Sequence, residues 1–266
     1  MNHNVPTIVT IKDATREEKQ TLKVMTLNMA HGRKDGPNQI FQKNKTIKSN
    51  LDTIARVLKR ERPDIVALQE ADGPSIWSGS FNHVHYLAEK SGFNYSIQGE
   101  HVQGIGLSYG TALLSQMPLV NPYAITFAPS LPTFSKGFVL ATVTWPADSH
   151  NKIDVVSVHL DFSRKSVRQR QVKDIINQLS SRNNPIVIMG DFNCDYEKQD
   201  SALCILAKSL NLKAYQAYDS TMKTFPTLKK RLDWILIDPK LEFSTYRTIS
   251  DILSDHKGVI GELLVN

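Results

Sequence analysis

The chain has 266 residues, 41% of them hydrophobic, which is enough to build one sizeable buried core. Its formal net charge of +6 gives weak support to a polyanionic partner, and its two cysteines are too few for a disulfide scaffold. No segment approaches the ~20 apolar residues of a membrane-spanning helix, and the N-terminus lacks a signal-peptide pattern, so we expect a cytoplasmic protein unless export is non-classical.

Residues 1–20 are polar and irregular, and we expect a loosely held N-terminal arm there. Beyond it, apolar runs alternate with helix-like periodic stretches, which indicates an α/β fold. The expected strands are Leu22–Leu27, Ile65–Leu68, Thr111–Leu114, Phe138–Val143, Ile153–Val158, Ile186–Met189, Leu232–Ile237 and Val259–Val265. The expected helices are Ile47–Arg62, His83–Lys90 and Val167–Leu179. No repeat or Pro/Gly-rich linker interrupts residues 21–266, which favours a single domain.

Several expected strands follow one another without a helix between them. This pattern predicts a mixed sheet, or two sheets packed together with helices outside. We interpret Gly99–Gly110 as a loop, because its glycines do not form a dinucleotide fingerprint. We interpret Pro122–Phe138 as a proline-bearing connector.

Three late segments place polar groups at the edges of apolar runs: Gly190-Asp191-Phe192-Asn193, Arg231-Leu232-Asp233-Trp234 and Ser254-Asp255-His256. The run before Asp191 reads as a buried strand, so Asp191 and Asn193 would emerge together at its end, on one side. Open α/β sheets place ligand chemistry at such strand ends.

Four earlier residues occupy similar positions: Asn28 and Glu70 each follow a strand, Tyr109 precedes one and His159 closes one. A single residue of this kind is more often a cap or a solvated turn residue. Together with the late segments, however, they supply oxygen ligands, hydrogen-bond donors and one imidazole that titrates near neutral pH. The combination predicts a metal-assisted phosphoester hydrolase.

The ordered motifs LNxxxG, LQE, YGxALLS, HLD, GDFN, RLDWIL and SDHxxV run from about Leu22 to Val265. This set resembles the endonuclease/exonuclease/phosphatase family, the deoxyribonuclease I-like group. The resemblance implies a four-layered α/β sandwich of two packed mixed β-sheets flanked by helices. It also implies phosphodiesterase or nuclease chemistry that depends on Mg²⁺, with Mn²⁺ as an alternative ion.

The resemblance implies that Glu70 is the principal metal ligand, with Asn28 nearby and Asp255 contributing directly or through water. Some family members carry an acid or amide two residues after the first Asn, whereas this chain has Ala30. The metal would therefore depend more heavily on Glu70.

For catalysis, the resemblance implies that His256 is the general base, oriented by a hydrogen bond to Asp233. Asp191 would position or help to activate the attacking water. Asn193 and His159 would donate to phosphoryl oxygens, and Tyr109 would support the phosphate or Glu70 unless it only packs on the preceding loop.

The substrate is less clearly encoded. A basic loop of Lys223, Lys229, Lys230 and Arg231 leads into the Asp233 strand and would steer phosphate toward the site. The partner is then a phosphoester substrate, either nucleic acid or a phospholipid headgroup, acted on by a monomer. The lipid-directed alternative, sphingomyelinase-like or phosphoinositide phosphatase-like, would need an apolar surface, for which Pro122–Phe138 with Phe127 and Phe134 is the candidate.

Two further interpretations complete the expectations. We expect surface or capping roles for His31, His83 and His85, because no carboxylate is spaced to meet them. A non-enzymatic scaffold is disfavoured, because none of the catalytic groups is missing.

Overall fold

Two seven-stranded β-sheets pack against each other in the computed structural model, which describes residues 1–12, 20–145, 151–196, 199–219 and 221–265. The first sheet has the order β1 (Asn2–Asn4), β7 (Val120–Thr126), β8 (Gly137–Thr144), β9 (Lys152–His159), β10 (Ile186–Asp191), β12 (Asp233–Ile237) and β11 (Lys213–Ala214). The second has the order β13 (Leu241–Thr248), β14 (Val259–Val265), β3 (Leu22–Asn28), β4 (Ile65–Asp72), β6 (Leu107–Ser115), β5 (Tyr95–Gly104) and β2 (Val9–Thr10). Each sheet is mixed, because β9 and β10 pair in parallel, as do β3 and β4.

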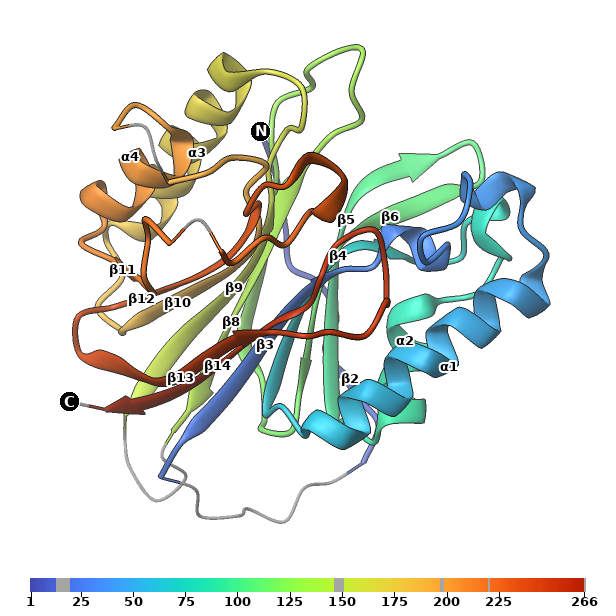
Figure 1. Cartoon of the computed structure of the whole chain (residues 1–266), viewed down its shortest axis with the longest axis horizontal. Coiled ribbons are helices and arrows are strands. Elements are labelled where there is room, and N and C mark those ends of the chain that lie inside the picture. Colours follow the sequence, from blue (N-terminus) through green and yellow to red (C-terminus); the bar gives the residue numbers. More distant parts are fainter. Residues whose placement is uncertain (13–19, 146–150, 197–198, 220, 266) are drawn as a thin grey trace.

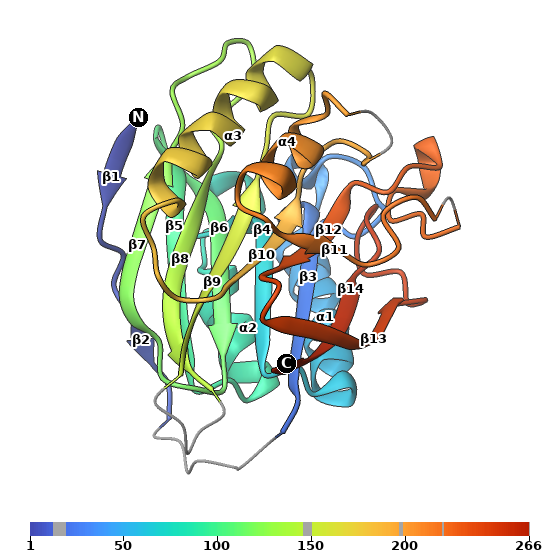
Figure 2. The same ribbon diagram turned by 90° about the vertical axis from the view of Figure 1, so that its left-hand side faces the viewer.

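Helices cover the outer face of each sheet (Figure 1). Helices α1 (Asn44–Glu61) and α2 (His83–Ser91) lie on the second sheet, while α3 (Lys165–Leu179) and α4 (Ala202–Ser209) lie on the first, where Figure 2 shows them in front of the strands. Four short 3-10 helices complete the described elements: η1 (Ala30–Gly32), η2 (Gln39–Phe41), η3 (Ile76–Ser78) and η4 (Pro226–Leu228). The expected four-layered sandwich is confirmed. None of the described helices is long and apolar enough to cross a membrane.

The helices dock through apolar stripes. In α1, Ile47, Leu51, Ile54 and Leu58 recur at helical spacing and are buried against β3, β4 and β6. Burying each such side chain contributes roughly 1.5–3 kcal/mol. A separate core fills the space between the two sheets, and a third lies under α3 and α4. The sheets are therefore held rigidly, which fixes the groups at their edges.

Two expectations about loops are wrong. Gly99–Gly110 contains no long loop, because β5 and β6 form an antiparallel hairpin across it. Its Gly110 is required by packing, since a Cβ there would lie 1.9 Å from the carbonyl oxygen of Gly99. The segment Pro122–Phe138 is only partly a connector: residues 122–126 belong to β7, Phe138 belongs to β8, and Pro122 is tolerated at a register shift in their pairing.

The expected irregular arm is also partly wrong. Asn2–Asn4 pairs with β7 as β1, and Val9–Thr10 pairs with β5 as β2, so each short strand extends the edge of a different sheet. Exposed strand edges are free to pair with an added chain segment, which explains why polar residues adopt β-structure here. Residues 13–19 of the arm lie outside the described residues. The single domain over 21–266 stays a prediction.

Candidate functional site

The site forms where strands of the first sheet end beside one another. Asp191 is the last residue of β10, and its register partners are His159 at the end of β9 and Asp233 at the start of β12. Three polar side chains from distant parts of the sequence are thereby brought together. The strand ends in a tight turn directly after Asp191. In this turn Asn193 has φ +52°, and its backbone N–H donates to Asp191 Oδ1 at 2.9 Å.

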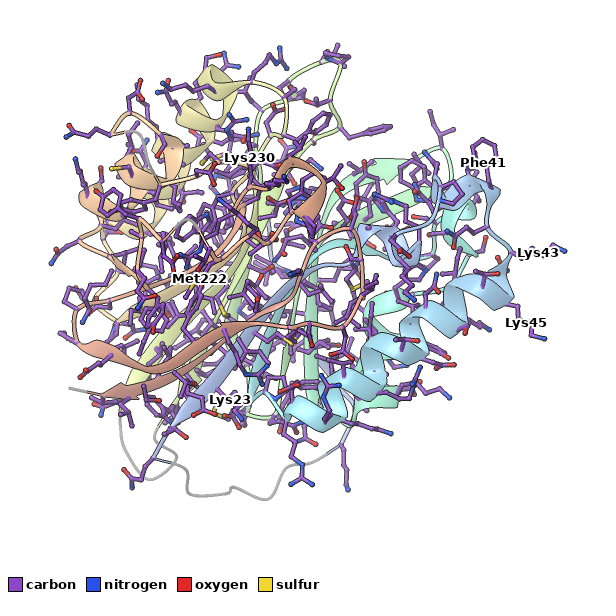
Figure 3. The ribbon with its side chains drawn as sticks, viewed as in Figure 1. Lys23, Phe41, Lys43, Lys45, Met222 and Lys230 are labelled. Carbon is purple, nitrogen blue, oxygen red and sulfur yellow. The ribbon has the colours of Figure 1, made fainter. Side chains whose placement is uncertain are left out.

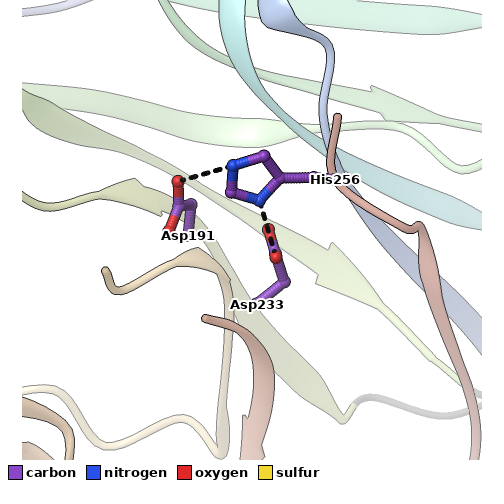
Figure 4. Close-up of side chains that lie close together, drawn as sticks. All are labelled: Asp191, Asp233 and His256. Atoms are coloured by element: carbon purple, nitrogen blue, oxygen red, sulfur yellow. Dashed lines mark hydrogen bonds and ion pairs between the residues drawn. The ribbon is translucent and has the colours of Figure 1, made fainter. Parts of the chain in front are cut away.

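His256 completes this group from the loop between β13 and β14. Its Nδ1 donates to Asp233 Oδ2 at 2.8 Å, and its Nε2 lies 3.8 Å from Asp191 Oδ2 (Figure 4). All three residues are buried. The hydrogen bond that sequence comparison implied between His256 and Asp233 is therefore present.

Thr224 fixes the start of β12. Its hydroxyl accepts from the backbone N–H of both Leu232 and Asp233, at 2.9 and 3.0 Å. The ring of the adjacent Phe225 lies against that of His256, with 4.8 Å between their centroids. These contacts restrict both members of the His–Asp pair.

The buried charges shift one another's protonation. Burial would lower the pKa of His256, but Asp233 and Asp191 outweigh it and raise that pKa to about 10. Burial raises the pKa of Asp191 to about 7, with His256 opposing the shift and Asp233 adding to it. Asp191 and His256 therefore shift each other's pKa, and their titrations are coupled.

His159 is held in its neutral form. Burial and the nearby ammonium of Lys136 lower its pKa well below the usual range. Lys136 Nζ lies 3.4 Å from His159 Nδ1, which must act as the acceptor because an ammonium only donates. The ring proton is then on Nε2, which lies 3.5 Å from Asp191 Oδ2. His159 can thus donate into the site.

Glu70 lies on the second sheet, at a distortion of β4. Its φ is +49°, in the left-handed region, and the pairing of β4 with β6 shifts register between Gln69 and Ala71. A bulge of this kind re-aims a side chain and is frequent beside active sites. Burial would raise the pKa of Glu70, but the charges of His31 and Lys136 hold it well below the usual range. Glu70 is therefore a carboxylate at neutral pH.

The expectation for His31 is wrong. His31 Nδ1 lies 2.7 Å from Asp72 Oδ1 and its Nε2 lies 3.3 Å from Glu70 Oε2, so two carboxylates meet one buried ring. The indole of Trp77 donates to the other oxygen of Asp72 at 3.0 Å, and the ring of Tyr109 meets His31 edge-on at 4.8 Å. Although burial opposes it, the two carboxylates raise the pKa of His31.

Asn28 links the two sheets. Its Nδ2 donates to Asp191 Oδ2 at 3.0 Å, while its Oδ1 accepts from the backbone of Ala30. A second bond also crosses between the sheets: Gln69 Nε2, on the second sheet, donates to Ser157 Oγ, on the first, at 3.0 Å. These buried cross-sheet bonds set the Glu70 half of the site relative to the His256 half.

Other predicted residues have different partners from those expected. Asp255 forms an ion pair with Arg33, and its second oxygen accepts from Ser254. The Asn193 side chain donates to the carbonyl of Leu160 at 3.0 Å. Their catalytic and metal roles stay predictions.

The histidine and basic-loop expectations are met only in part. His85 is on the surface as expected, whereas His83 is buried and bonds the carbonyl of Ser78. In the basic loop, Lys229 and Lys230 are exposed. Arg231 is buried instead, with its guanidinium 3.8 Å from the ring centroid of Trp234, which makes its proposed steering of phosphate wrong.

The donor set fits a divalent cation at Glu70. Hard cations prefer carboxylate and amide oxygens, which Glu70 and Asn28 supply. Asp191, Asp233 and His256 offer ligand atoms within 4.8 Å of one another, but Asp233 Oδ2 and His256 Nδ1 are committed to their mutual hydrogen bond. Asp233 Oδ1, however, has no hydrogen-bond partner among the described residues, so both groups offer ligand atoms, and the assignment of the metal to Glu70 stays a prediction.

Residues 25–256 match the model of the endonuclease/exonuclease/phosphatase family. The chain belongs to this family. Its members are hydrolases that act on phosphoester bonds and generally depend on a divalent metal. No curated protein matches the sequence.

Similar solved structures share the fold at low identity. A family protein from Beutenbergia cavernae aligns with a TM-score of 0.73 and 19% identity, over 93% of this chain and 72% of its own. The sulfate-bound catalytic domain of human Nocturnin gives 0.71 and 18%, over 98% of each chain. A mannosyl-6-phosphatase from Bacteroides thetaiotaomicron gives 0.68 and 16%, over 91% of this chain and 99% of that one.

Sequence reasoning missed three residues of the site, Lys136, Asp72 and Trp77. Lys136 was missed because its segment, Pro122–Phe138, was interpreted only for its apolar residues. Asp72 lies two residues after Glu70 in the run LQEAD. The acid at 72 was the one available signal, because residues two apart in a distorted strand can meet the same neighbour.

Proposed function

We propose that this chain hydrolyses a phosphoester bond with the help of a divalent cation, Mg²⁺ by preference and Mn²⁺ as a substitute. The observation that carries the proposal is His256, which bonds Asp233 through Nδ1 and presents Nε2 toward Asp191. A ring held in this way is oriented for proton transfer at one nitrogen only.

A cation bound by Glu70, with Asn28 beside it, would polarise a phosphoryl oxygen and offset the negative charge of the substrate. The chain's own donors act on the remaining oxygens. His159 carries its proton on Nε2, and Lys136 is a buried cation next to it. Both would stabilise charge as it develops on the phosphoryl group.

Proton acceptance is assigned to His256 together with Asp191. Above about pH 7 the pair holds one proton, on the ring, because the pKa of His256 is about 10 and that of Asp191 is about 7. A water between Nε2 and Oδ2 can contact both atoms and give its proton to the pair as it attacks. The hydrogen bond from Nδ1 to Asp233 Oδ2 stabilises the imidazolium ring.

The names of two structural neighbours point to phosphate-like anions. The Nocturnin structure contains a bound sulfate, and the Bacteroides protein is named as a phosphatase. These names are compatible with an anionic phosphate substrate. The substrate itself is left open between nucleic acid and a phospholipid headgroup, and between a diester and a monoester.

The test is a hydrolysis panel run with Mg²⁺, with Mn²⁺ and with EDTA. It covers bis(p-nitrophenyl) phosphate, p-nitrophenyl phosphate, plasmid, abasic-site duplex, RNA, sphingomyelin and phosphoinositides. We expect activity with the metals only, and none in His256→Ala. The matched control is His85→Ala, because His85 is a surface histidine whose nearest charged partner is Glu89. Full activity in His256→Ala would refute the proposal.

A further inference from the structure

Large apolar side chains are exposed on several loops near the Glu70 half of the site. They lie in η2, η3, the β5–β6 turn, the β7–β8 loop and the loop before α3, and their exposed fractions run from 52% for Phe134 to 97% for Ile105. We call this set the apolar rim: Phe41, Ile76, Ile105, Leu131, Phe134 and Phe162. Exposed apolar groups that gather in one region mark an interaction surface, whereas scattered ones do not.

Contacts show that these loops adjoin one another. Helix η2 contacts η3, and the backbone N–H of Ile76 donates to the carbonyl of Gly106 in the β5–β6 turn at 2.9 Å. Next to Ile76, the ring of Trp77 lies edge-on to that of Phe134, with centroids 6.0 Å apart. The rim therefore continues from η2 to the β7–β8 loop.

The other end of the rim is fixed by Asp161. This carboxylate accepts from Ser130 at 3.3 Å and from Thr133 at 2.6 Å, on either side of Leu131, and it precedes Phe162 in sequence. Phe134 also meets the ring of Tyr109, which in turn meets His31 beside Glu70. Ring contacts thus connect the rim to the Glu70 half of the site.

Ile105 is the clearest member. It has φ +52° between two glycines that also have positive φ, Gly104 and Gly106. A β-branched residue is strongly disfavoured in this conformation, and a third glycine would adopt it without strain. A residue that is both strained and almost fully exposed contributes nothing to the core, which makes Ile105 a candidate for contact with a partner.

Cations interleave with the rim. Lys43 and Lys45 follow Phe41 on exposed positions. Arg164 and Lys165 follow Phe162 and are also exposed, although Arg164 donates to the carbonyl of Ser130 and Lys165 pairs with Asp200. Figure 3 shows Phe41, Lys43 and Lys45 projecting from the same edge of the molecule. The chain as a whole carries a formal charge of +6. A surface that pairs apolar tips with cations is complementary to an anionic membrane interface.

We infer that the apolar rim docks the protein on an anionic lipid bilayer, with the rim side chains in the headgroup region and the cations against lipid phosphates. Nucleic acid would also attract the cations, but it is bound by stacking on aromatic rings. Three of the six rim residues are aliphatic, and the most exposed of them, Ile105, has no ring to stack. Aliphatic tips gain instead from leaving water for acyl chains.

Docking in this way would bring lipid headgroups close to Phe134, whose ring contacts that of Tyr109 beside the Glu70 half of the site. The phosphoester substrate is then one carried by a lipid, a step that rests on the proposed function. Membrane binding by the rim does not rest on it, because no rim residue takes part in proton transfer or metal binding.

The test is sedimentation of the full chain with phosphatidylcholine vesicles, with and without phosphatidylserine, in EDTA. We compare wild type with the double variant Phe41→Ser/Ile105→Ser. The control is Val120→Ser, which removes an exposed valine where β7 begins, at the end of that strand away from the β7–β8 loop. We expect binding that requires phosphatidylserine and weakens with salt, and a partition coefficient about tenfold lower in the double variant only.

Failure to bind anionic vesicles would overturn the inference, as would equal binding by wild type and the double variant. Binding of a single-stranded oligonucleotide that the double variant loses, without vesicle binding, would assign the rim to nucleic acid instead. Hydrolysis of bis(p-nitrophenyl) phosphate is measured in parallel and should be unchanged in all three proteins. Absence of that activity in wild type would refute the proposed function and leave the vesicle result to judge the rim.

Discussion

Replacing Asp233 by asparagine tests the His–Asp pair while keeping the size of the side chain. Asp233 is fully buried, and its Oδ2 accepts from His256 Nδ1 at 2.8 Å. Its Oδ1 has no hydrogen-bond partner among the described residues. The carboxylate charge is therefore directed at the imidazole ring.

The magnitude follows from that single contact. A buried hydrogen bond to a charged group contributes about 1.5–3 kcal/mol. Since 1.36 kcal/mol corresponds to one pKa unit or a tenfold rate change, losing it lowers the pKa of His256 by roughly one to two units and kcat by about ten- to a hundredfold. The pKa falls from about 10 because Asp233 is the largest factor that raises it. KM should change little, because the Asp233 carboxylate bonds the His256 ring and is fully buried behind it.

Two measurements check this prediction. NMR titration of the His256 ring gives the pKa, and the rate of metal-dependent hydrolysis gives kcat. The control is Asp238→Asn, which removes a similar charge just beyond the other end of β12. If Asp233→Asn lowered the pKa of His256 but left kcat unchanged, the assignment of His256 to proton transfer would be refuted. An unchanged pKa would mean that the hydrogen bond is not formed in solution.

Three further predictions follow from the same structure. Mg²⁺ at a hundred times its Kd should raise the free energy of unfolding by about 2.7 kcal/mol, and Glu70→Gln should remove this increment in a thermal shift assay. His31→Asn, which suits the positive φ at that position, should weaken metal binding about ten- to a hundredfold in calorimetry, because His31 orients Glu70. His101 is buried between Thr126 and Thr111, and burial lowers its pKa from 6.5 to about 3. The neutral His101 ring therefore stabilises the fold fully above pH 6.5, and this stabilisation is lost as pH falls, by about 2 kcal/mol at pH 5. Urea unfolding at pH 7 and pH 5 should show this loss in wild type and not in His101→Gln.

Strands that are apolar throughout were predictable because their boundaries coincide with changes in composition. Val259–Val265 is β14 as expected, and the run that begins at Ile186 is β10 with two residues added. The edge strand β13 was missed, since its exposed side chains carry no apolar pattern. Helix α4 was missed for the opposite reason: an almost wholly apolar run of eight residues does not distinguish helix from strand.

Two buried basic residues, one misinterpreted from the sequence and one missed, show a different limit. Arg231 and Lys136 are both buried, and charge alone does not reveal this. Arg231 is held by the carbonyls of Tyr215 and Gln216 and by the ring of Trp234, contacts that depend on the folded position of a distant segment. Lys136 meets His159 only because β8 and β9 pair as neighbours. The sequence shows how many cations the chain has, but it does not show which of them are buried and which are exposed.

The site depends on two sheets in a way that no local pattern encodes. The motif containing Asn28 suggested a metal ligand, yet its amide also donates to Asp191 on the opposite sheet. That bond joins the half of the site that would hold the cation to the half that would transfer the proton, so the distance between them is set by packing of the core between the sheets. His31 acts on the first half in the same manner, reaching Asp72 and Glu70 only because Ala30 and His31 both adopt positive φ. The sequence motifs therefore identify which groups are present, whereas their relative placement arises from buried contacts and strained backbone between the motifs.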